Sequence, residues 1–434
     1  MTHALNDTHD PHARSWIASA NDAAAEFPLQ NLPYCVFLAP GSHQASIGVG
    51  IGDCILDLSK VAQAGILTFD FATLNAFMQQ TFNQVMGLDA ATLSRTRGAL
   101  FKLLRDDCPE HVRDQLRPYM ATAQECRLLL PAQIGDYTDF LTSAWHTERH
   151  GRFKGLQDPM PAAFYSLPIA YHGRASSITT SGTPVRRPNG QFKGADGALC
   201  FGPSQAMDFE LEMAAFVARG SRLGQPVSVS AAGDHLFGYT LLNDWSAKDI
   251  QWWEQVLGPF LGKSFMSSLS PWVITAEALA PFRGPMSPRP AHAPPVMPHL
   301  AGTNDTLDVT LQAWLRTERM QRDDLPAVLI SSTNPRNLSW NFEQMLTHHT
   351  SNGCNLRAGD LLGSGTVSGE SPSAMGCLTE MTSAGKQALE LPGGERRLWL
   401  QDGDEIRFDA RASRPGFVSI GFGQCVGKIV AAVN

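Results

Sequence analysis

The stretch DFELEMAAFV, residues 208–217, strongly restricts the fold of the chain around it. Acidic and apolar residues alternate with a period of two, so a β-strand would put Asp208, Glu210 and Glu212 on one face. Residues 214–217 are apolar on both faces, which indicates a strand that runs into a core. Carboxylates on such a strand must face water or meet a positive charge. The stretch therefore predicts a buried sheet with an acidic face at its edge.

The composition and sequence pattern of the rest of the chain are typical of a mainly β protein. Its 434 residues include 38 glycines and 28 prolines, which favours many turns. IGVGIGD is typical of a hairpin, and strand-like runs such as HLFGYTLLND and FVSIGFGQCV dominate the second part of the chain. Helices are expected over Phe71–Met86, after a capping Asp89, and around Leu338–His349. We predict a flexible arm over 1–27, a small β domain with linking helices over 28–130, and a second, mainly strand-built domain over 131–434 that holds nearly all the unusual residues.

Charge and cysteine usage exclude several classes of partner. The formal net charge is −7 and the basic residues form no cluster, which argues against nucleic acid and anionic membranes. No run of 18 apolar residues is present, and the N-terminal sequence MTHALNDTHDPHARSW lacks an apolar signal core. The eight cysteines form no C-x-x-C pair, so we interpret them as reduced, mostly buried thiols of a cytoplasmic protein.

Glu210 and Glu212 are candidate ligands for a hard cation. Their Cβ atoms would lie roughly 6–7 Å apart on one strand face, so both carboxylates can reach one ion. Mg²⁺ and Ca²⁺ prefer oxygen ligands and would relieve the repulsion between the two charges. Asp139, expected with Asp136 in a turn, and Asp244, at the end of an apolar strand, strengthen this hypothesis. The alternatives are a solvated strand face for the glutamates and a helix-capping role for Asp244.

His146 is a candidate general base, with an ordinary surface or core histidine as the alternative. A base needs an orienting carboxylate and a nearby electrophile. The chain has no G-x-S-x-G nucleophile elbow and its cysteines lack an obvious base, which favours water as the nucleophile. Zinc is disfavoured, because no Cys or His lies at ligand spacing near the acids and HTERH, residues 146–150, lacks the glutamate position of the zinc-protease helix. Lys263, in GPFLGKSF, is either an exposed loop residue or, if buried, a cation that stabilises an oxyanion.

Together these motifs resemble the fumarylacetoacetase family along nearly the whole chain. The resemblance is carried, in the family's order, by FPLQNLPYCVF, IGDYTDF, YHGRASS, DFELEMAAF, NDWSAKDIQWWE, GPFLGKSF, LTHHTSNGCNLRAGDLLGSGT and IGFGQC. It implies an SH3-like N-terminal barrel and a C-terminal β-roll that forms a homodimer. It also implies metal-dependent hydrolysis of the carbon–carbon bond of a 1,3-diketone acid. The implied substrate is fumarylacetoacetate, which is cleaved to fumarate and acetoacetate at the end of tyrosine and homogentisate catabolism.

The same resemblance implies a role for each site residue. Mg²⁺ or Ca²⁺ would be held by Asp139, Glu210, Glu212 and Asp244. His146 would activate water while Glu380 orients the imidazole, as the acid does in a triad. Oxyanion stabilisation is implied for Lys263, Gln251 and Lys248, and substrate contact for Gln251, Tyr171 and Thr366. Ser267, with Lys263, falls near a second, weaker cation site, and Asp208 is expected to support the ligands from outside or to face solvent.

Four substrate-contacting positions depart from the family's pattern. Leu141 and Gln255 stand where tyrosines are usual, and Lys154 and Lys248 stand where arginines are usual. Lysine cannot reproduce the bidentate fork of arginine. An enzyme of the same fold acting on another acylpyruvate or acylacetoacetate is therefore an alternative, beside simple drift around an unchanged substrate. A binding protein that has lost catalysis is a further alternative, against which the complete acid set and the His146–Glu380 pair argue.

Overall fold

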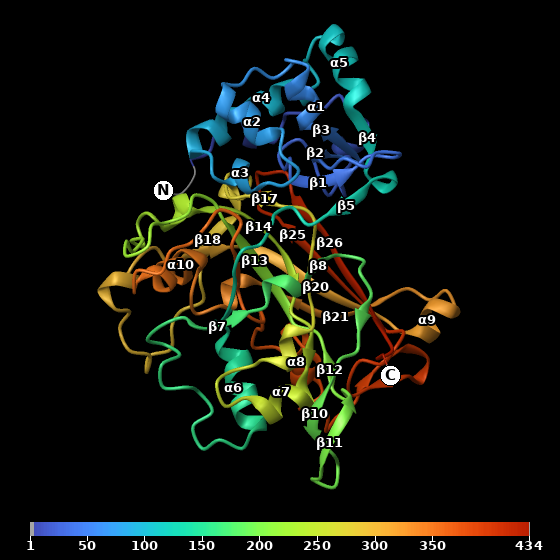
Figure 1. The fold of residues 1–434 in the computed structure, drawn as a ribbon, viewed down its shortest axis with the longest axis vertical. Coiled ribbons are helices and arrows are strands. Elements are labelled where there is room, and N and C mark those ends of the chain that lie inside the picture. Colours follow the sequence, from blue (N-terminus) through green and yellow to red (C-terminus); the bar gives the residue numbers. More distant parts are fainter. Residues whose placement is uncertain (1–3, 434) are drawn as a thin grey trace.

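The computed structural model describes residues 4–433, which form a smaller N-terminal domain and a larger, strand-rich C-terminal domain (Figure 1). The N-terminal domain is built on one five-stranded sheet. Its order is β4 (Met120–Thr122), β3 (Cys54–Asp57), β2 (Ser46–Ile51), β1 (Tyr34–Leu38) and β5 (Arg127–Leu129). The hairpin expected in IGVGIGD is confirmed, because β2 and β3 pair antiparallel around Gly52, where φ is +58°.

Short helices accompany this sheet: α1 (Leu58–Gln63), α2 (Phe71–Phe77), α3 (Asn83–Met86), α4 (Ala90–Leu104) and α5 (Glu110–Leu116). The capping role of Asp89 is confirmed, since its carboxylate accepts from the Thr92 N–H at 2.9 Å at the start of α4. The single helix expected over Phe71–Met86 is wrong. Phe77 and Phe82 are both fully buried, and side chains five residues apart on one helix would point roughly 140° apart. The break between α2 and α3 lets both rings enter the core.

The leading segment, expected to be a flexible arm, lies against the body of the protein. Thr8 and His9 are buried. The Asn6 side chain donates to Glu277 Oε1 at 2.7 Å, and His9 Nε2 lies 2.8 Å from the Glu277 carbonyl oxygen. Trp16 Nε1–H donates to the Leu103 carbonyl at 2.9 Å. Residues 6–16 therefore contact both domains rather than extending away from them.

Two large sheets make up most of the C-terminal domain. The eight-stranded sheet runs β7 (Ile169–Gly173), β6 (Tyr137–Leu141), β22 (Leu361–Gly363), β13 (Leu211–Val217), β14 (Leu236–Asn243), β16 (Ser267–Leu269) and β8 (Ile178–Thr180), with β17 (Ile274–Thr275) also on β14. The five-stranded sheet runs β21 (Val328–Thr333), β20 (Val309–Arg316), β25 (Glu405–Ala412), β26 (Ile420–Val430) and β9 (Val185–Arg186). The protein is therefore mainly β, as expected.

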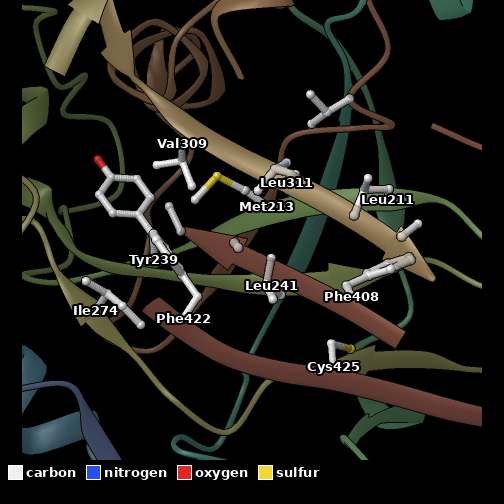
Figure 2. Close-up of a cluster of buried hydrophobic side chains, with 14 of the residues drawn as sticks. Leu211, Met213, Tyr239, Leu241, Ile274, Val309, Leu311, Phe408, Phe422 and Cys425 are labelled. Atoms are coloured by element: carbon white, nitrogen blue, oxygen red, sulfur yellow. The ribbon is translucent and has the colours of Figure 1, made fainter. Parts of the chain in front are cut away.

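The main core lies between these two sheets (Figure 2). Leu211 and Met213 of β13 point into it beside Leu311 of β20 and Phe408 of β25. Ala214 and Phe216, on the opposite face of β13, belong to the cluster that includes the N-terminal domain. The strand expected over residues 208–217 is confirmed only from Leu211 onward, because Asp208 belongs to β12 (Met207–Asp208) and Phe209 and Glu210 lie in neither strand. From Ala214 on, β13 is apolar on both faces, where it passes between two cores. Glu212 lies on the face of Ala214, and Glu210 precedes the strand.

The remaining strands form small ladders: β10 (Asn189–Lys193) with β11 (Leu199–Pro203), β12 (Met207–Asp208) with β15 (Ser246–Ala247), β18 (Arg283–Pro285) with β19 (Asp305–Leu307), and β23 (Leu389–Glu390) with β24 (Arg396–Arg397). The helices of this domain are α6 (Ala144–Phe153), α7 (Lys248–Glu254), α8 (Leu261–Ser264), α9 (Glu318–Arg322), α10 (Phe342–Thr350) and α11 (Leu378–Met381). The helix expected around Leu338–His349 begins later, at a capping box between Asn341 and Gln344.

No helix within residues 4–433 is long and apolar enough to span a bilayer. All eight cysteines are free thiols.

Candidate active site

One pocket in the C-terminal domain collects nearly all the residues singled out in the sequence. Its volume is about 320 Å³, and α6, α7 and α8 lie around it, on the side away from the N-terminal domain (Figure 1). Its lining includes Asp139, Leu141, His146, Lys154, Tyr171, Glu210, Glu212, Lys248, Gln251, Gln255, Lys263 and Thr366. Asp244 and Glu380 lie directly behind this lining, hydrogen-bonded to Tyr171 and His146.

Three carboxylates converge beside the pocket, with one oxygen each from Asp139, Glu212 and Asp244 within 4.8 Å of one another. They come from β6, from β13 and from the residue that follows β14, three strands of the same sheet. Asp139 lies in a strand rather than in the expected turn, because β6 pairs with both β7 and β22. Asp244 is not a helix cap, since α7 starts only at Lys248. The hydroxyl of Tyr171, opposite Asp139 in the ladder, donates to Asp244 Oδ2 at 2.7 Å.

The GSGT turn, residues 363–366, makes room for the Asp139 carboxylate. Gly363 pairs with Asp139, and an added Cβ there would lie 2.4 Å from Asp139 Oδ1. Gly365 has a φ of +73°, which favours glycine, and its N–H donates to the same oxygen at 3.2 Å. A side chain at position 363 would therefore displace the carboxylate, and one at position 365 would collide with the Phe140 carbonyl oxygen, 1.9 Å from the added Cβ.

The cluster has the properties of a cation site. Burial, together with the Asp244 charge, raises the pKa of Asp139 to about 8. Burial and the charge of Asp139 raise the pKa of Glu212 well above its usual range. Both Glu212 oxygens are buried, and within residues 4–433 neither has a hydrogen-bond partner. Buried, unpartnered oxygens beside two like charges fit a hard divalent ion such as Mg²⁺ or Ca²⁺.

Glu210, the fourth expected ligand, directs its oxygens to two buried lysines. Lys248 Nζ lies 2.5 Å from Oε1, and Lys263 Nζ contacts Oε2. Although burial opposes ionisation, the two ammonium groups hold the pKa of Glu210 well below its usual range. Lys263 also donates to Asp244 Oδ2 at 2.6 Å, and the Ser267 hydroxyl donates to Asp244 Oδ1 at 2.9 Å. Lys263 is therefore buried within the acid cluster, and the alternative of an exposed loop lysine is wrong.

The histidine and its expected partner are brought together. His146, in α6, places Nδ1 3.0 Å from Glu380 Oε2, although the two residues are 234 positions apart. The Ser368 hydroxyl donates to the same oxygen at 2.6 Å, and Arg149 Nη1 donates to Oε1 at 3.0 Å. Despite burial, the neighbouring His146 keeps the pKa of Glu380 well below its usual range. Sequence reasoning missed Arg149 and Ser368, although Arg149 follows His146 by one turn of the helix.

Asp208 does not face solvent, which corrects one branch of the sequence expectation. It is fully buried, and its carboxylate accepts from the Leu378 N–H at 2.7 Å and the Thr379 N–H at 2.9 Å. These are the first residues of α11, which carries Glu380. The three alternating acids thus have three different partners. Asp208 accepts from the first N–H groups of α11, Glu210 pairs with two lysines, and Glu212 belongs to the carboxylate cluster.

A second group of metal-binding side chains lies on the other side of His146. Cys377 Sγ is 3.9 Å from His146 Nδ1 and 3.9 Å from His150 Nε2. The interpretation that the cysteines lack a neighbouring base is therefore wrong for Cys377. The four-residue spacing of His146 and His150 was visible in HTERH, but Cys377 is more than 220 residues away and comes close only through the packing of α11 on α6.

The residues expected to contact substrate line the open part of the pocket. Lys154 Nζ donates to Gln255 Oε1 at 2.7 Å, which joins the end of α6 to the end of α7. Burial and the charge of Lys248 lower the pKa of Lys154. Gln251 Oε1 is buried without a hydrogen-bond partner among the described residues. The pocket thus offers cationic and amide groups on the wall that faces the carboxylates.

Comparison with known proteins places the chain among enzymes of one family. Residues 137–430 match the fumarylacetoacetate (FAA) hydrolase C-terminal model, and residues 30–131 match the fumarylacetoacetase N-terminal model. The chain is 42% identical to a fumarylacetoacetase from Arabidopsis thaliana, over 96% of this chain and 98% of that one. It is 42% identical to the Homo sapiens fumarylacetoacetase, over 96% and 99% of the two chains, and 44% identical to the Caenorhabditis elegans one, over 94% and 97%.

A solved structure agrees at the level of the fold. A fumarylacetoacetate hydrolase from Exiguobacterium antarcticum superposes with a TM-score of 0.51 at 18% sequence identity, covering 92% of this chain and 99% of that chain. The matched models, the full-length relatives and the two-sheet fold lead to one conclusion. The chain belongs to the fumarylacetoacetate hydrolase family.

Proposed function

We propose that this protein hydrolyses fumarylacetoacetate to fumarate and acetoacetate. The observation that carries the proposal is the His146–Glu380 pair at the wall of the pocket that also contains Asp139 and Glu212. A general base beside a cation-binding group of carboxylates suits the attack of water on a 1,3-diketone. Full-length relatives that bear the name fumarylacetoacetase support the same substrate.

His146 acts as the base in this proposal. Its Nδ1–H donates to Glu380 Oε2, which leaves Nε2 free to take a proton from water in the pocket. Arg149 and Ser368 keep Glu380 ionised and fixed, so that the carboxylate stabilises the imidazolium that forms. The water oxygen then bonds to the ketone carbonyl carbon of the fumaryl group, which becomes a tetrahedral alkoxide.

The pocket cations stabilise that alkoxide. Lys263 uses two of its three N–H groups on Glu210 and Asp244, so one remains for substrate. Lys248 and Gln251 supply further donors from α7. When the alkoxide collapses, the carbon–carbon bond breaks and its electron pair leaves with the acetoacetate fragment as an enolate. The enolate takes up the proton held by His146, which restores the base.

The cation would be held by Asp139, Glu212 and Asp244, with Glu210 as the expected fourth ligand. A bound Mg²⁺ or Ca²⁺ would supply Lewis-acid polarisation of the diketone oxygens. Leu141, Lys154, Tyr171, Gln255 and Thr366 line the space left for the organic substrate. The possible second cation position at Lys263 and Ser267 lies against Asp244, within the same network.

The proposal extends to the setting of the enzyme. We infer a cytoplasmic homodimer, associated through the C-terminal domain, that acts in tyrosine and phenylalanine catabolism. Light scattering on the purified protein tests the dimer, and a mass equal to one chain of 47.1 kDa would contradict it.

Steady-state turnover tests the proposed reaction. We expect kcat/KM for fumarylacetoacetate of at least about 10⁴ M⁻¹s⁻¹, the lower range for ordinary enzymes, with fumarate and acetoacetate formed in equal amounts. Other acylacetoacetates and acylpyruvates, measured in parallel, should be poorer substrates. A value several orders of magnitude lower, with faster turnover of one of these other diketones, would refute the assigned substrate.

A further inference from the structure

A group of nitrogen and sulfur ligands lies beside the catalytic pocket, separate from the carboxylate cluster. His146 Nδ1 or Nε2, His150 Nδ1 or Nε2 and Cys377 Sγ provide ligand atoms within 4.8 Å of one another. His146 and His150 are one helical turn apart in α6, and their ring centroids are separated by 4.1 Å. Cys377 immediately precedes α11 and is fully buried. The proposed hydrolysis uses neither His150 nor Cys377.

The spacing of these atoms is close to that of a metal site. With Zn–N bonds of about 2.0–2.1 Å and a Zn–S bond of about 2.3 Å, tetrahedral coordination puts nitrogen and sulfur roughly 3.5 Å apart. The observed separations from Cys377 Sγ to His146 Nδ1 and His150 Nε2 are 3.9 Å each. A contraction of a few tenths of an ångström, which side-chain rotation can supply, would bring all three ligands onto one ion.

We propose that His146, His150 and Cys377 form a second metal site, which binds a thiophilic divalent ion such as Zn²⁺ and thereby blocks the general base. Imidazole and thiolate select zinc-like ions, whereas the oxygen cluster of Asp139, Glu212 and Asp244 suits Mg²⁺ or Ca²⁺. The two sites are thus chemically distinct although they adjoin one pocket. His146 and His150 both line that pocket, which gives an ion a route to the cluster.

Occupancy would disable His146 directly, and this consequence rests on its proposed role as base. Glu380 Oε2 contacts His146 Nδ1 at 3.0 Å, and Cys377 Sγ lies 3.4 Å from the same oxygen. An ion on Nδ1 replaces the proton that Nδ1 donates to Glu380. A neutral imidazole that binds the ion through Nδ1 carries its one ring proton on Nε2, so Nε2 has no lone pair left to accept a proton from water.

The protonation states of His150 and Cys377 make metal binding at this second site observable. Burial, with the charge of His146, lowers the pKa of His150, so its ring is neutral and has a free lone pair. Burial raises the pKa of the Cys377 thiol, so the thiol must lose its proton when an ion binds. Binding therefore releases a proton into solution and forms a sulfur–metal bond, which can be detected without any assay of turnover.

The binding test uses the full-length protein with Mg²⁺ at saturation, so that the carboxylate cluster is filled. Zn²⁺ is added in equilibrium dialysis, and Co²⁺ is used as the spectroscopic probe. We expect one further ion per chain, and a thiolate-to-Co²⁺ charge-transfer band. In Cys377→Ser both should be lost or weakened at least about 10-fold, and His150→Asn should also weaken Zn²⁺ binding. Cys354→Ser, which changes a cysteine in a surface turn, is the matched control and should bind as the wild type does.

Inhibition provides the second readout. Zn²⁺ should inhibit the Mg²⁺-loaded wild type and Cys354→Ser at the concentration at which it binds, while Cys377→Ser should need at least about 10-fold more. Equal Zn²⁺ binding and inhibition in wild type and Cys377→Ser would overturn the proposal, because the ion would then act at the carboxylates. Absence of a Co²⁺ thiolate band would overturn it as well. If the protein does not hydrolyse fumarylacetoacetate, the dialysis and absorption results still decide the metal site independently.

Discussion

The carboxylate of Asp208 accepts two hydrogen bonds from Thr379, from its backbone N–H at 2.9 Å and from its hydroxyl at 2.6 Å. Its other oxygen accepts from the Leu378 N–H at 2.7 Å. These bonds hold the start of α11 one residue before Glu380. A strand residue outside the pocket therefore positions the carboxylate that contacts His146.

We expect Asp208→Asn to lower both stability and turnover. The amide replaces one acceptor oxygen by a donor, which would face the donors of Thr379 or Leu378. A buried donor without an acceptor costs about 1–3 kcal/mol, which urea denaturation measures as a lower free energy of unfolding. The loss of these bonds would let the start of α11 move and carry Glu380 away from His146. Because Glu380 acts on the base and not on substrate binding, kcat should fall by a larger factor than KM changes.

The matched control is Asp136→Asn, an exposed aspartate paired with Arg357 at 2.6 Å. It should change the free energy of unfolding by less than about 0.5 kcal/mol and leave kcat unchanged. An Asp208→Asn protein as stable and as active as the wild type would refute the positioning role of Asp208.

Glu380→Gln should reduce kcat by about 10³–10⁴-fold with little change in KM, the size seen when a triad acid is neutralised. Arg149 draws the amide oxygen toward itself, so the amide nitrogen faces His146 Nδ1. That arrangement favours the tautomer with the proton on Nε2, which cannot accept a proton from water. Stopped-time product analysis checks the rate, with the exposed Glu370→Gln as control. Retention of more than about a tenth of kcat would contradict an orienting role for Glu380.

The local features of this chain were predictable because they depend on neighbouring residues alone. The pleat of a strand decides that Glu210 and Glu212 share a face, and the capping role of Asp89 needs only the residues that follow it. Contacts between distant elements were not accessible in this way. Asp208 and Thr379 are 171 residues apart, and spacing gives no reason to pair them. The expected partnership of His146 and Glu380 came from family resemblance, not from residue pattern.

One prediction and one alternative from the sequence are not adopted by the protein, and in both cases tertiary packing overrode a local signal. Gly135 and Asp136 favour a turn before Asp139, yet pairing with β7 and β22 makes residues 137–141 a strand. Asp244 precedes polar residues that suit a capping role, but Lys263, Ser267 and Tyr171 take both of its oxygens. In each case the deciding partner lies in another element of the domain.

Lys154→Met should raise KM for fumarylacetoacetate about 10-fold and change kcat less. Lys154 supplies a cation at the pocket wall, where its Nζ lies 2.7 Å from Gln255 Oε1. A hydrogen bond to a charged group is worth about 1.5–3 kcal/mol, so losing it from an anionic substrate accounts for at least this change. Lys154→Arg should retain most of the affinity, and the exposed Lys102→Met should leave both constants unchanged. An unaltered KM in Lys154→Met would place the substrate carboxylate elsewhere.

Chelator-treated protein should lose stability as the pH rises, and a divalent cation should remove that dependence. The pKa of Asp139 is raised to about 8 in the folded protein, against about 3.9 in an unfolded chain. Between these two values the folded state binds more protons than the unfolded state. The free energy of unfolding therefore decreases with rising pH, by up to about 1.4 kcal/mol per pH unit for each proton. Urea denaturation at several pH values between 5 and 8 (roughly this window) measures the slope.

A bound cation should flatten this slope, because it takes the place of the proton between the carboxylates. Mg²⁺ at 100 times its dissociation constant adds about 2.7 kcal/mol of stability, and the gain should grow with pH. Glu212→Gln removes one of the like charges, so its chelator-treated form should show a shallower slope and gain little from Mg²⁺. The exposed Glu125→Gln should behave as the wild type does. Equal slopes for the wild type with and without Mg²⁺ would mean that Asp139 and Glu212 do not share a cation.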